Sequence, residues 1–136
     1  MSESVPDVQV LVFRLADERY CIDIAHVDEI VDREELTQLP NAKPHVEGVM
    51  DLRGTTATIV NPKTVLDLDD SASGDRVVVL DTEDEGNTGW LIDEVSRVVS
   101  VDETGLDESV EGESVRGVVR RDDDFVIWIE PSAVHA

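Results

Sequence analysis

His45–Val60 reads H-V-E-G-V-M-D-L-R-G-T-T-A-T-I-V, and the organisation of the rest of the chain follows from this segment. Its apolar residues on either side of Arg53-Gly54 predict two short strands joined by a tight turn. Gly48 and Gly54 mark places where the backbone comes close to another segment or takes a positive φ. The predicted turn displays Arg53 with no nucleophile, metal-ligand cluster or phosphate loop beside it. This arrangement is typical of a recognition surface.

Runs of β-branched and alternating apolar residues predict further strands on both sides of this segment. These strands are expected at residues 8–15, 19–24, 76–80, 89–93, 95–101, 115–120 and 125–130, with a further brief one at 36–39. Short helical turns are expected at 62–68 and after Pro131. The fold class is therefore mainly β, with two half-sized antiparallel barrels and short helices.

The chain divides into a polar lead-in at residues 1–7 and a single domain at 8–136. The polar connector at 69–75 is the expected break between the two halves of that domain. No internal sequence repeat is strong enough to show that the two halves are equivalent.

A helix is also expected near the middle of the first half. Val27, Ile30 and Val31 are spaced at i, i+3 and i+4, which places them on one helical face. If this helix packs beside the 46–60 hairpin, Glu29 can hold the guanidinium of Arg53 in one orientation. A pre-oriented arginine on a mostly apolar surface is a common protein–protein anchor. An ordinary surface ion pair, worth about 0–1 kcal/mol, fits the same spacing, so both interpretations stay open at this point.

Charge dominates the composition, with 32 Asp and Glu against 11 Lys and Arg and a formal net charge of −21. Such a chain is repelled by nucleic acid and by anionic membranes, so we expect neither a nucleic-acid partner nor direct membrane insertion. We interpret the charge as adaptation to high salt in a halophile, where self-repulsion is screened. Circular dichroism across a potassium chloride series tests this interpretation, and an unchanged fold in low salt would count against it.

The location expected from the sequence is the cytoplasm. Residues 1–7 lack the apolar segment of a secretory signal. The single cysteine, Cys21, has no partner for an internal disulfide, as is usual in a reducing compartment. Because its neighbours are carboxylates, we expect a packed or half-exposed residue rather than a reactive thiolate.

The sequence contains none of the common motifs of enzymes: no G-x-x-x-x-G-K-[ST], no G-x-G-x-x-G and no G-x-S-x-G. His26, His45 and His135 lack the spacing of zinc ligands. We therefore predict no catalytic activity, no cofactor and no metal. The acidic segment at 81–86 begins like a calcium loop, but the twelfth position is Ile92 instead of a glutamate. The alternative function is a calcium- or small-ligand-binding β-barrel protein that uses its acidic loops, and calorimetry with calcium would test it.

Several segments together resemble the CheW family of chemotaxis coupling proteins. The resemblance begins with V-L-V-F-R-L-A-D-E-R-Y-C-I-D-I at 10–24 and V-D-E-I-V at 27–31. Its most specific part is P-N-A-K-P-H-V-E-G-V-M-D-L-R-G at 40–54. It continues with I-V-N-P-K-T-V-L-D-L at 59–68, G-W-L-I-D-E-V at 89–95 and F-V-I-W-I-E-P at 125–131. It therefore covers nearly the whole chain.

This resemblance implies an adaptor that catalyses no reaction. The implied fold is two five-stranded SH3-like barrels packed around a shared apolar core. The implied partners are the cytoplasmic tip of methyl-accepting chemotaxis receptors and the regulatory domain of the histidine kinase CheA, within receptor arrays. By motif, the receptor-contact positions fall on Val27, Glu29, Leu36, Gly48 and Arg53. The kinase-facing surface is implied to be apolar and to lie on the exposed ends of the barrels.

Overall fold

The computed structural model describes residues 8–66, 68, 74–80, 87–101, 106–107, 115–121 and 124–130. Its strands are β1 (Val8–Leu15), β2 (Glu18–Asp23), β3 (Val27–Asp32), β4 (Val46–Leu52), β5 (Thr55–Val60), β6 (Arg76–Leu80), β7 (Asn87–Ile92), β8 (Glu94–Val101), β9 (Leu106–Asp107), β10 (Val115–Arg121) and β11 (Asp124–Ile129). Two short helical turns interrupt them, η1 (Ile24–His26) and α1 (Pro62–Val65). The fold is mainly β, as predicted. The predicted helical turn after Pro131 and most of the connector at 69–75 lie outside the described residues.

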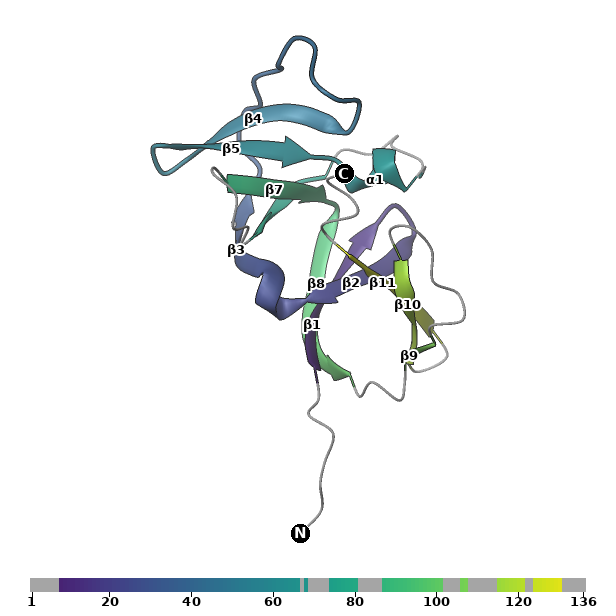
Figure 1. Ribbon diagram of the computed structural model, residues 1–136. Coiled ribbons are helices and arrows are strands. Elements are labelled where there is room, and N and C mark those ends of the chain that lie inside the picture. The colour runs from purple at the N-terminus through teal and green to yellow at the C-terminus, as the bar shows by residue number, and fades with distance from the viewer. Residues whose placement is uncertain are drawn as a thin grey trace.

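The strands form two sheets that lie one above the other in Figure 1. The six-stranded sheet has the order β8-β1-β2-β11-β10-β9, and the five-stranded sheet has the order β3-β6-β7-β5-β4. The last strand of the six-stranded sheet, β9, has only two residues and pairs with β10. The sequence pattern predicts no strand at these residues. The two sheets agree in number with the two predicted half-sized barrels, but β6 and β7, which follow the connector at 69–75, belong to the same sheet as β3, β4 and β5.

The two sheets share one plan, which their strand pairings reveal. In each, two antiparallel hairpins join side by side through one parallel pair, β5 with β7 and β2 with β11. A further strand then lies beside one hairpin, β3 next to β6 and β8 next to β1. The N-terminal hairpin β1–β2 thus takes the place in its sheet that β6–β7 takes in the other. Because β1–β2 and β10–β11 come from opposite ends of the chain, no tandem sequence repeat reveals this equivalence.

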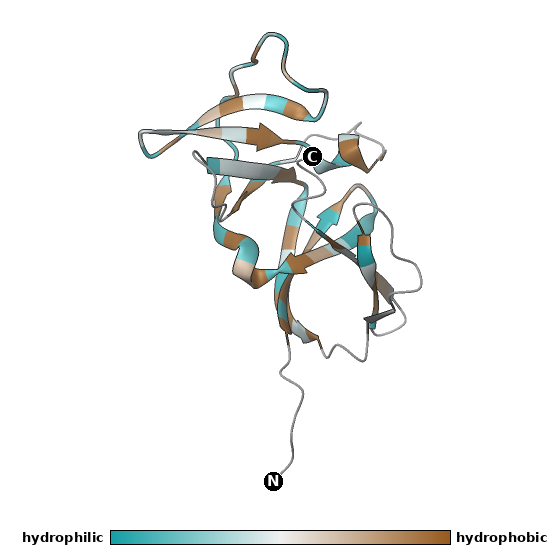
Figure 2. Ribbon diagram, viewed as in Figure 1, coloured by the Kyte–Doolittle hydropathy of each residue, from teal (hydrophilic) through white to brown (hydrophobic). Residues whose placement is uncertain are grey.

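Among the described residues, buried apolar side chains form three clusters. The inter-sheet core lies between the two sheets and includes Phe13, Tyr20 and Trp90. The six-stranded sheet encloses a second cluster around Trp128, and the five-stranded sheet a third around Met50. Apolar and polar residues alternate along several strands, as Figure 2 shows in brown and teal. The central strands β1 and β6 are instead buried on both faces, because each lies between the inter-sheet core and the cluster that its own sheet encloses.

The predicted helix at 27–31 is wrong, because these residues form the edge strand β3, paired with β6. A bulge at Asp28 explains the misleading pattern. The extra residue puts Val27 and Ile30, three positions apart, on the same face, where both pack on the inter-sheet core. Val31 packs on the other side, against the cluster around Met50. A bulged strand therefore reproduces the i, i+3 spacing of a helix, and the β-branched residues favour the strand.

Candidate functional site

The turn between β4 and β5 displays Arg53 as the sequence predicts. Arg53 and Gly54 form a two-residue hairpin turn in which both have positive φ, 53° and 85°. Two positive φ values at these positions suit the right-handed twist of the flanking strands. The turn directs the Arg53 side chain outward, where 74 % of it is exposed.

Glu29 on β3 holds the guanidinium of Arg53 in a hydrogen-bonded ion pair. The predicted contact is therefore present, although a strand provides Glu29 in place of the predicted helix. The Glu29 side chain is only 24 % exposed, so it is the anchored member of the pair and Arg53 is the displayed member. The pair joins the edge strand β3 to the hairpin at the opposite edge of the five-stranded sheet.

Gly48 lies in β4 at a bulge, where the register with β5 shifts between Val46 and Gly48. Its φ is 149°, and an added Cβ would overlap the backbone carbonyl of Thr37. The close approach lets the segment after β3 run along β4, with N–H···O bonds of 2.9 and 2.8 Å between Thr37 and Val49. The brief strand predicted at 36–39 is reduced to this single bridge, because only one residue pair comes into register.

Leu36 and Val27 are half-buried, and they lie in different surroundings. Leu36 packs against the cluster around Met50, on the side of the sheet where the segment after β3 meets β4. Val27 packs against the inter-sheet core. The bulge at Asp28 turns Val27 and Glu29 to opposite faces of β3. The structure thus joins Glu29 to Arg53, packs Leu36 on the cluster that the five-stranded sheet encloses, and leaves Val27 on the inter-sheet side.

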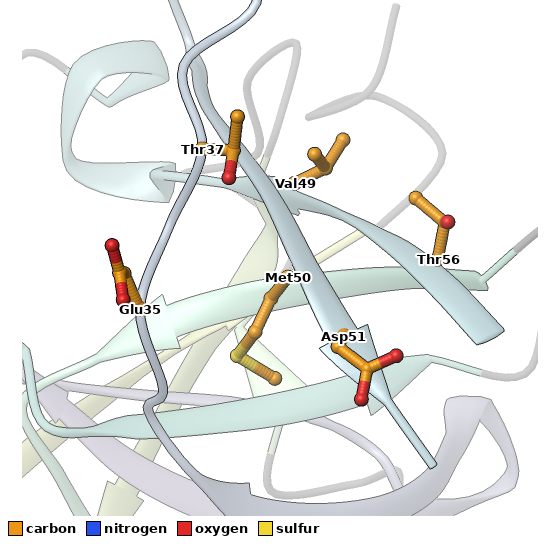
Figure 3. Close-up of a pocket in the computed structure, with 6 residues that line it drawn as sticks. All are labelled: Glu35, Thr37, Val49, Met50, Asp51 and Thr56. Carbon is orange, nitrogen blue, oxygen red and sulfur yellow. The ribbon is translucent and has the colours of Figure 1, made fainter. Parts of the chain in front are cut away.

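A pocket of about 360 Å³ opens beside this group, between the segment after β3 and the β4–β5 hairpin. Figure 3 shows Glu35 and Thr37 on the passing segment and Val49, Met50, Asp51 and Thr56 on the hairpin. The sequence pattern does not predict this pocket, although Gly48 marks the close approach of Thr37, one of its lining residues. We call the surface formed by Glu29, Arg53, Leu36 and this pocket the rim of the five-stranded sheet.

Buried polar side chains are a second feature that the sequence analysis missed. Lys63 and Asn61 are each 2 % exposed, at the point where β5 leads into α1. Asp93 forms an ion pair with Lys63, with Nζ and Oδ1 2.8 Å apart. Their 30-residue separation and ordinary surroundings give no sequence signal of this pairing.

Cys21 is fully buried beside Trp128, in the packed role that the sequence predicts. Burial raises the pKa of its thiol to about 12. Because the thiolate is the reactive form, a pKa this far above neutrality leaves the thiol inert. Burial, with a smaller contribution from Glu18, also raises the pKa of Tyr20.

Within the described ranges, no three His, Cys, Asp or Glu side chains gather closely enough to hold a metal ion. The calcium-like segment at 81–86 lies outside those ranges. No helix in the described part of the chain has the length and apolar character needed to cross a membrane.

Comparison with known proteins agrees with the fold. The CheW-like domain model matches residues 9–136. The chemotaxis protein CheW of Treponema pallidum is 31 % identical over 134 residues, covering 90 % of this chain and 78 % of that protein. The CheW of Thermotoga maritima is 24 % identical, covering 96 % of this chain and 89 % of that protein. The crystal structure of the scaffolding protein CheW from Thermoanaerobacter tengcongensis has a TM-score of 0.80 at 25 % identity, covering 92 % of this chain and 90 % of that one.

These matches place the chain in the scaffold class of proteins. Because the family model matches residues 9–136, this chain belongs to the CheW-like domain family. It is a chemotaxis coupling adaptor. The calcium- or small-ligand-binding alternative is not favoured by these relatives.

Proposed function

We propose that this chain links the cytoplasmic tip of chemotaxis receptors to the regulatory domain of the histidine kinase CheA, without catalysing a reaction itself. Its place of action is the cytoplasm, at receptor arrays. The two partners dock on separate surfaces, so that a change in receptor state alters the geometry of the bound kinase. Such coupling requires only that the adaptor contact the two receptor states differently.

The observation that carries the receptor site is the Glu29–Arg53 ion pair. A free arginine side chain loses rotamer freedom when it binds, at a cost of about 0.5–1.5 kcal/mol. Glu29 has already restrained Arg53 in the unbound adaptor, because the half-buried carboxylate holds the exposed guanidinium. The ion pair itself contributes little to stability at such exposure. Its better use is to present Arg53 to a partner in one orientation.

The geometry of the rim suits a helical partner. A receptor helix would lay an apolar face over Leu36 and extend one side chain into the pocket lined by Val49 and Met50. Arg53 would fix the register of that helix through a hydrogen bond or ion pair. Gly48 supports this surface from below through its contact with Thr37. Val27 takes part only if the partner reaches around the edge strand β3.

Binding of a purified receptor cytoplasmic fragment, measured in high potassium chloride, tests this site. We expect Arg53→Ala to weaken receptor binding by about 30-fold, in line with a loss of about 2 kcal/mol for an arginine anchor. Glu29→Gln should weaken it less, because Arg53 remains but is no longer held by a charge. Binding of the CheA regulatory domain should not change in either variant.

Arg76→Ala is the matched control. Arg76 forms an exposed ion pair with Asp32 on the same sheet, with NH1 and Oδ1 2.9 Å apart. Its loss should leave receptor binding unchanged. Equal losses in Arg53→Ala and Arg76→Ala would show that overall charge governs binding and would contradict the proposed site.

A further inference from the structure

A chain of buried and partly buried polar contacts runs from one sheet to the other. Glu47 in β4 accepts a hydrogen bond from Asn61 Nδ2 at 2.8 Å, and Asn61 Oδ1 accepts one from the Lys63 backbone N–H at 3.0 Å. Lys63 Nζ then donates to Asp93 Oδ1 at 2.8 Å. Asp93 Oδ2 accepts the backbone N–H of Ala16 at 2.7 Å. Glu47 belongs to the five-stranded sheet and Ala16 to the β1–β2 turn of the six-stranded sheet, so the contacts connect the two.

The central pair is deeply buried, since the side chains of Lys63 and Asp93 are 3 % and 6 % exposed. Removing two charges from water carries a large desolvation penalty, and their mutual attraction often only balances that penalty. Replacing a buried ion pair by apolar residues of similar size is often neutral or stabilising. The pair therefore calls for an explanation beyond stability, and directional contact between elements is one that buried polar groups can provide.

The location of the pair supplies that explanation. Asp93 lies between β7 and β8, where the chain passes from the five-stranded sheet to the six-stranded sheet. Its backbone N–H also bonds to the carbonyl of Arg14 at 3.1 Å. The other described passage, through η1, carries Asp23, whose carboxylate instead accepts the N–H of Ala25 two residues on. Asp93, unlike Asp23, therefore binds a side chain from another element, namely Lys63 of α1, which follows β5 of the five-stranded sheet.

The receptor-side surface is connected to the same chain of contacts. Glu47 is the extra residue of the β4 bulge, directly before Gly48. The bulge therefore serves two purposes: it admits Thr37 on one side and directs Glu47 toward Asn61 on the other. A shift of β4 caused by a bound partner would therefore change the hydrogen bond from Asn61 to Glu47 and, through Asn61, the position of Lys63.

We propose that Lys63 and Asp93 are positioning residues that fix the orientation of one sheet relative to the other. The apolar inter-sheet core holds the sheets together, but hydrophobic attraction itself is non-directional. The ion pair and its hydrogen bonds require particular distances and angles, so they select one orientation. The consequence for signalling rests on the proposed function: a receptor bound at the rim meets a kinase surface held at a defined angle.

Distance measurement between spin labels on the two sheets tests the positioning role. Gln9→Cys on β1 and Thr55→Cys on β5 are exposed labelling sites, one on each sheet. Cys21 is fully buried and stays unlabelled. We expect one narrow distance peak in the doubly labelled parent. Lys63→Met should lose that narrow peak and give a broader or shifted distribution, whereas Arg76→Met, which removes only an exposed ion pair, should keep it.

A second variant separates orientation from stability. Lys63→Met leaves Asp93 as an uncompensated buried charge, so it should lower the melting temperature strongly. The double change Lys63→Met and Asp93→Asn removes both charges and keeps an oxygen for the Ala16 N–H. We expect it to recover thermal stability and still show the broad distance distribution. A narrow parental peak in the folded double variant would overturn the proposal, and so would failure of that variant to fold.

The signalling consequence has its own readout. CheA regulatory-domain binding is measured with the adaptor alone and with the adaptor bound to a receptor fragment. In the double variant, receptor binding alone should match the parent, and kinase binding by the receptor-bound adaptor should fall about fivefold or more, the lower range of typical coupling effects. If the parent itself fails to bind receptor, the proposed function fails, and the label distances still decide the positioning role.

Discussion

At the residue scale, Arg53 shows how one side chain can be both exposed and restrained. Its hairpin turn is set by positive φ at Arg53 and Gly54, and its guanidinium is held by Glu29. The turn was predictable, because a glycine after an exposed residue between two apolar runs favours a two-residue hairpin. The contact with Glu29 was predicted for the wrong reason, since a bulged strand delivers this residue to the place that a helix was expected to reach.

The buried thiol of Cys21 gives a prediction at the same scale. Its pKa is raised from 9.0 to about 12 by burial, so the folded protein binds this proton more tightly than the unfolded chain. The free energy of unfolding should therefore be unaffected by the thiol below pH 9 and should fall between about pH 9 and 12, by at most about 1.4 kcal/mol per pH unit. Tyr20, whose pKa is also raised, contributes a loss of the same sign.

Urea denaturation at a series of alkaline pH values measures this dependence. Cys21→Ala is the control, because it removes the thiol and should reduce the slope while keeping the contribution of Tyr20. An identical slope in the parent and in Cys21→Ala would contradict the assignment. Thiol-reactive reagent should also leave native Cys21 unmodified at pH 8 and modify it once the protein unfolds.

At the element scale, β3 and β4 organise the rim, and they differ in how far the sequence predicts them. The β4–β5 hairpin was predicted with nearly its observed bounds, since local turn chemistry and strand pattern agree. The strand β3 was not predicted, because its bulge at Asp28 breaks the two-residue alternation and imitates helical spacing. The passage of Thr37 along β4 depends on tertiary packing, of which Gly48 is the one local sign.

Gly48 gives a prediction at this scale. Gly48→Ala should lower the free energy of unfolding by about 1–3 kcal/mol, because the methyl group meets the carbonyl of Thr37 and the residue keeps a positive φ. Amide hydrogen exchange at Thr37 and Val49 should accelerate, since their paired N–H groups lose protection. Gly54→Ala is the control, as open space surrounds that position and only the positive φ, worth about 1 kcal/mol, is penalised. Equal destabilisation by both changes would contradict the role of close packing at Gly48.

At the scale of the whole molecule, the mainly β class and the two half-sized barrels were predictable from strand patterns and turn signals. The sequence did not predict that strands from both ends of the chain complete one sheet. This arrangement depends on parallel pairing between β2 and β11, which lie near opposite ends of the chain. The buried Lys63–Asp93 pair was equally hidden, because burial is decided by how the sheets pack. Adaptation to high salt remains a prediction from the net charge of −21.

The most direct test of the coupling role is retention of the CheA regulatory domain on an immobilised receptor cytoplasmic fragment, with and without this chain, in high potassium chloride. The kinase domain should be retained only when the chain is present. Arg53→Ala should abolish this retention while still binding the kinase domain in solution. Retention that does not depend on the chain, or a wild-type chain that binds neither partner, would contradict its role as the link between receptor and kinase.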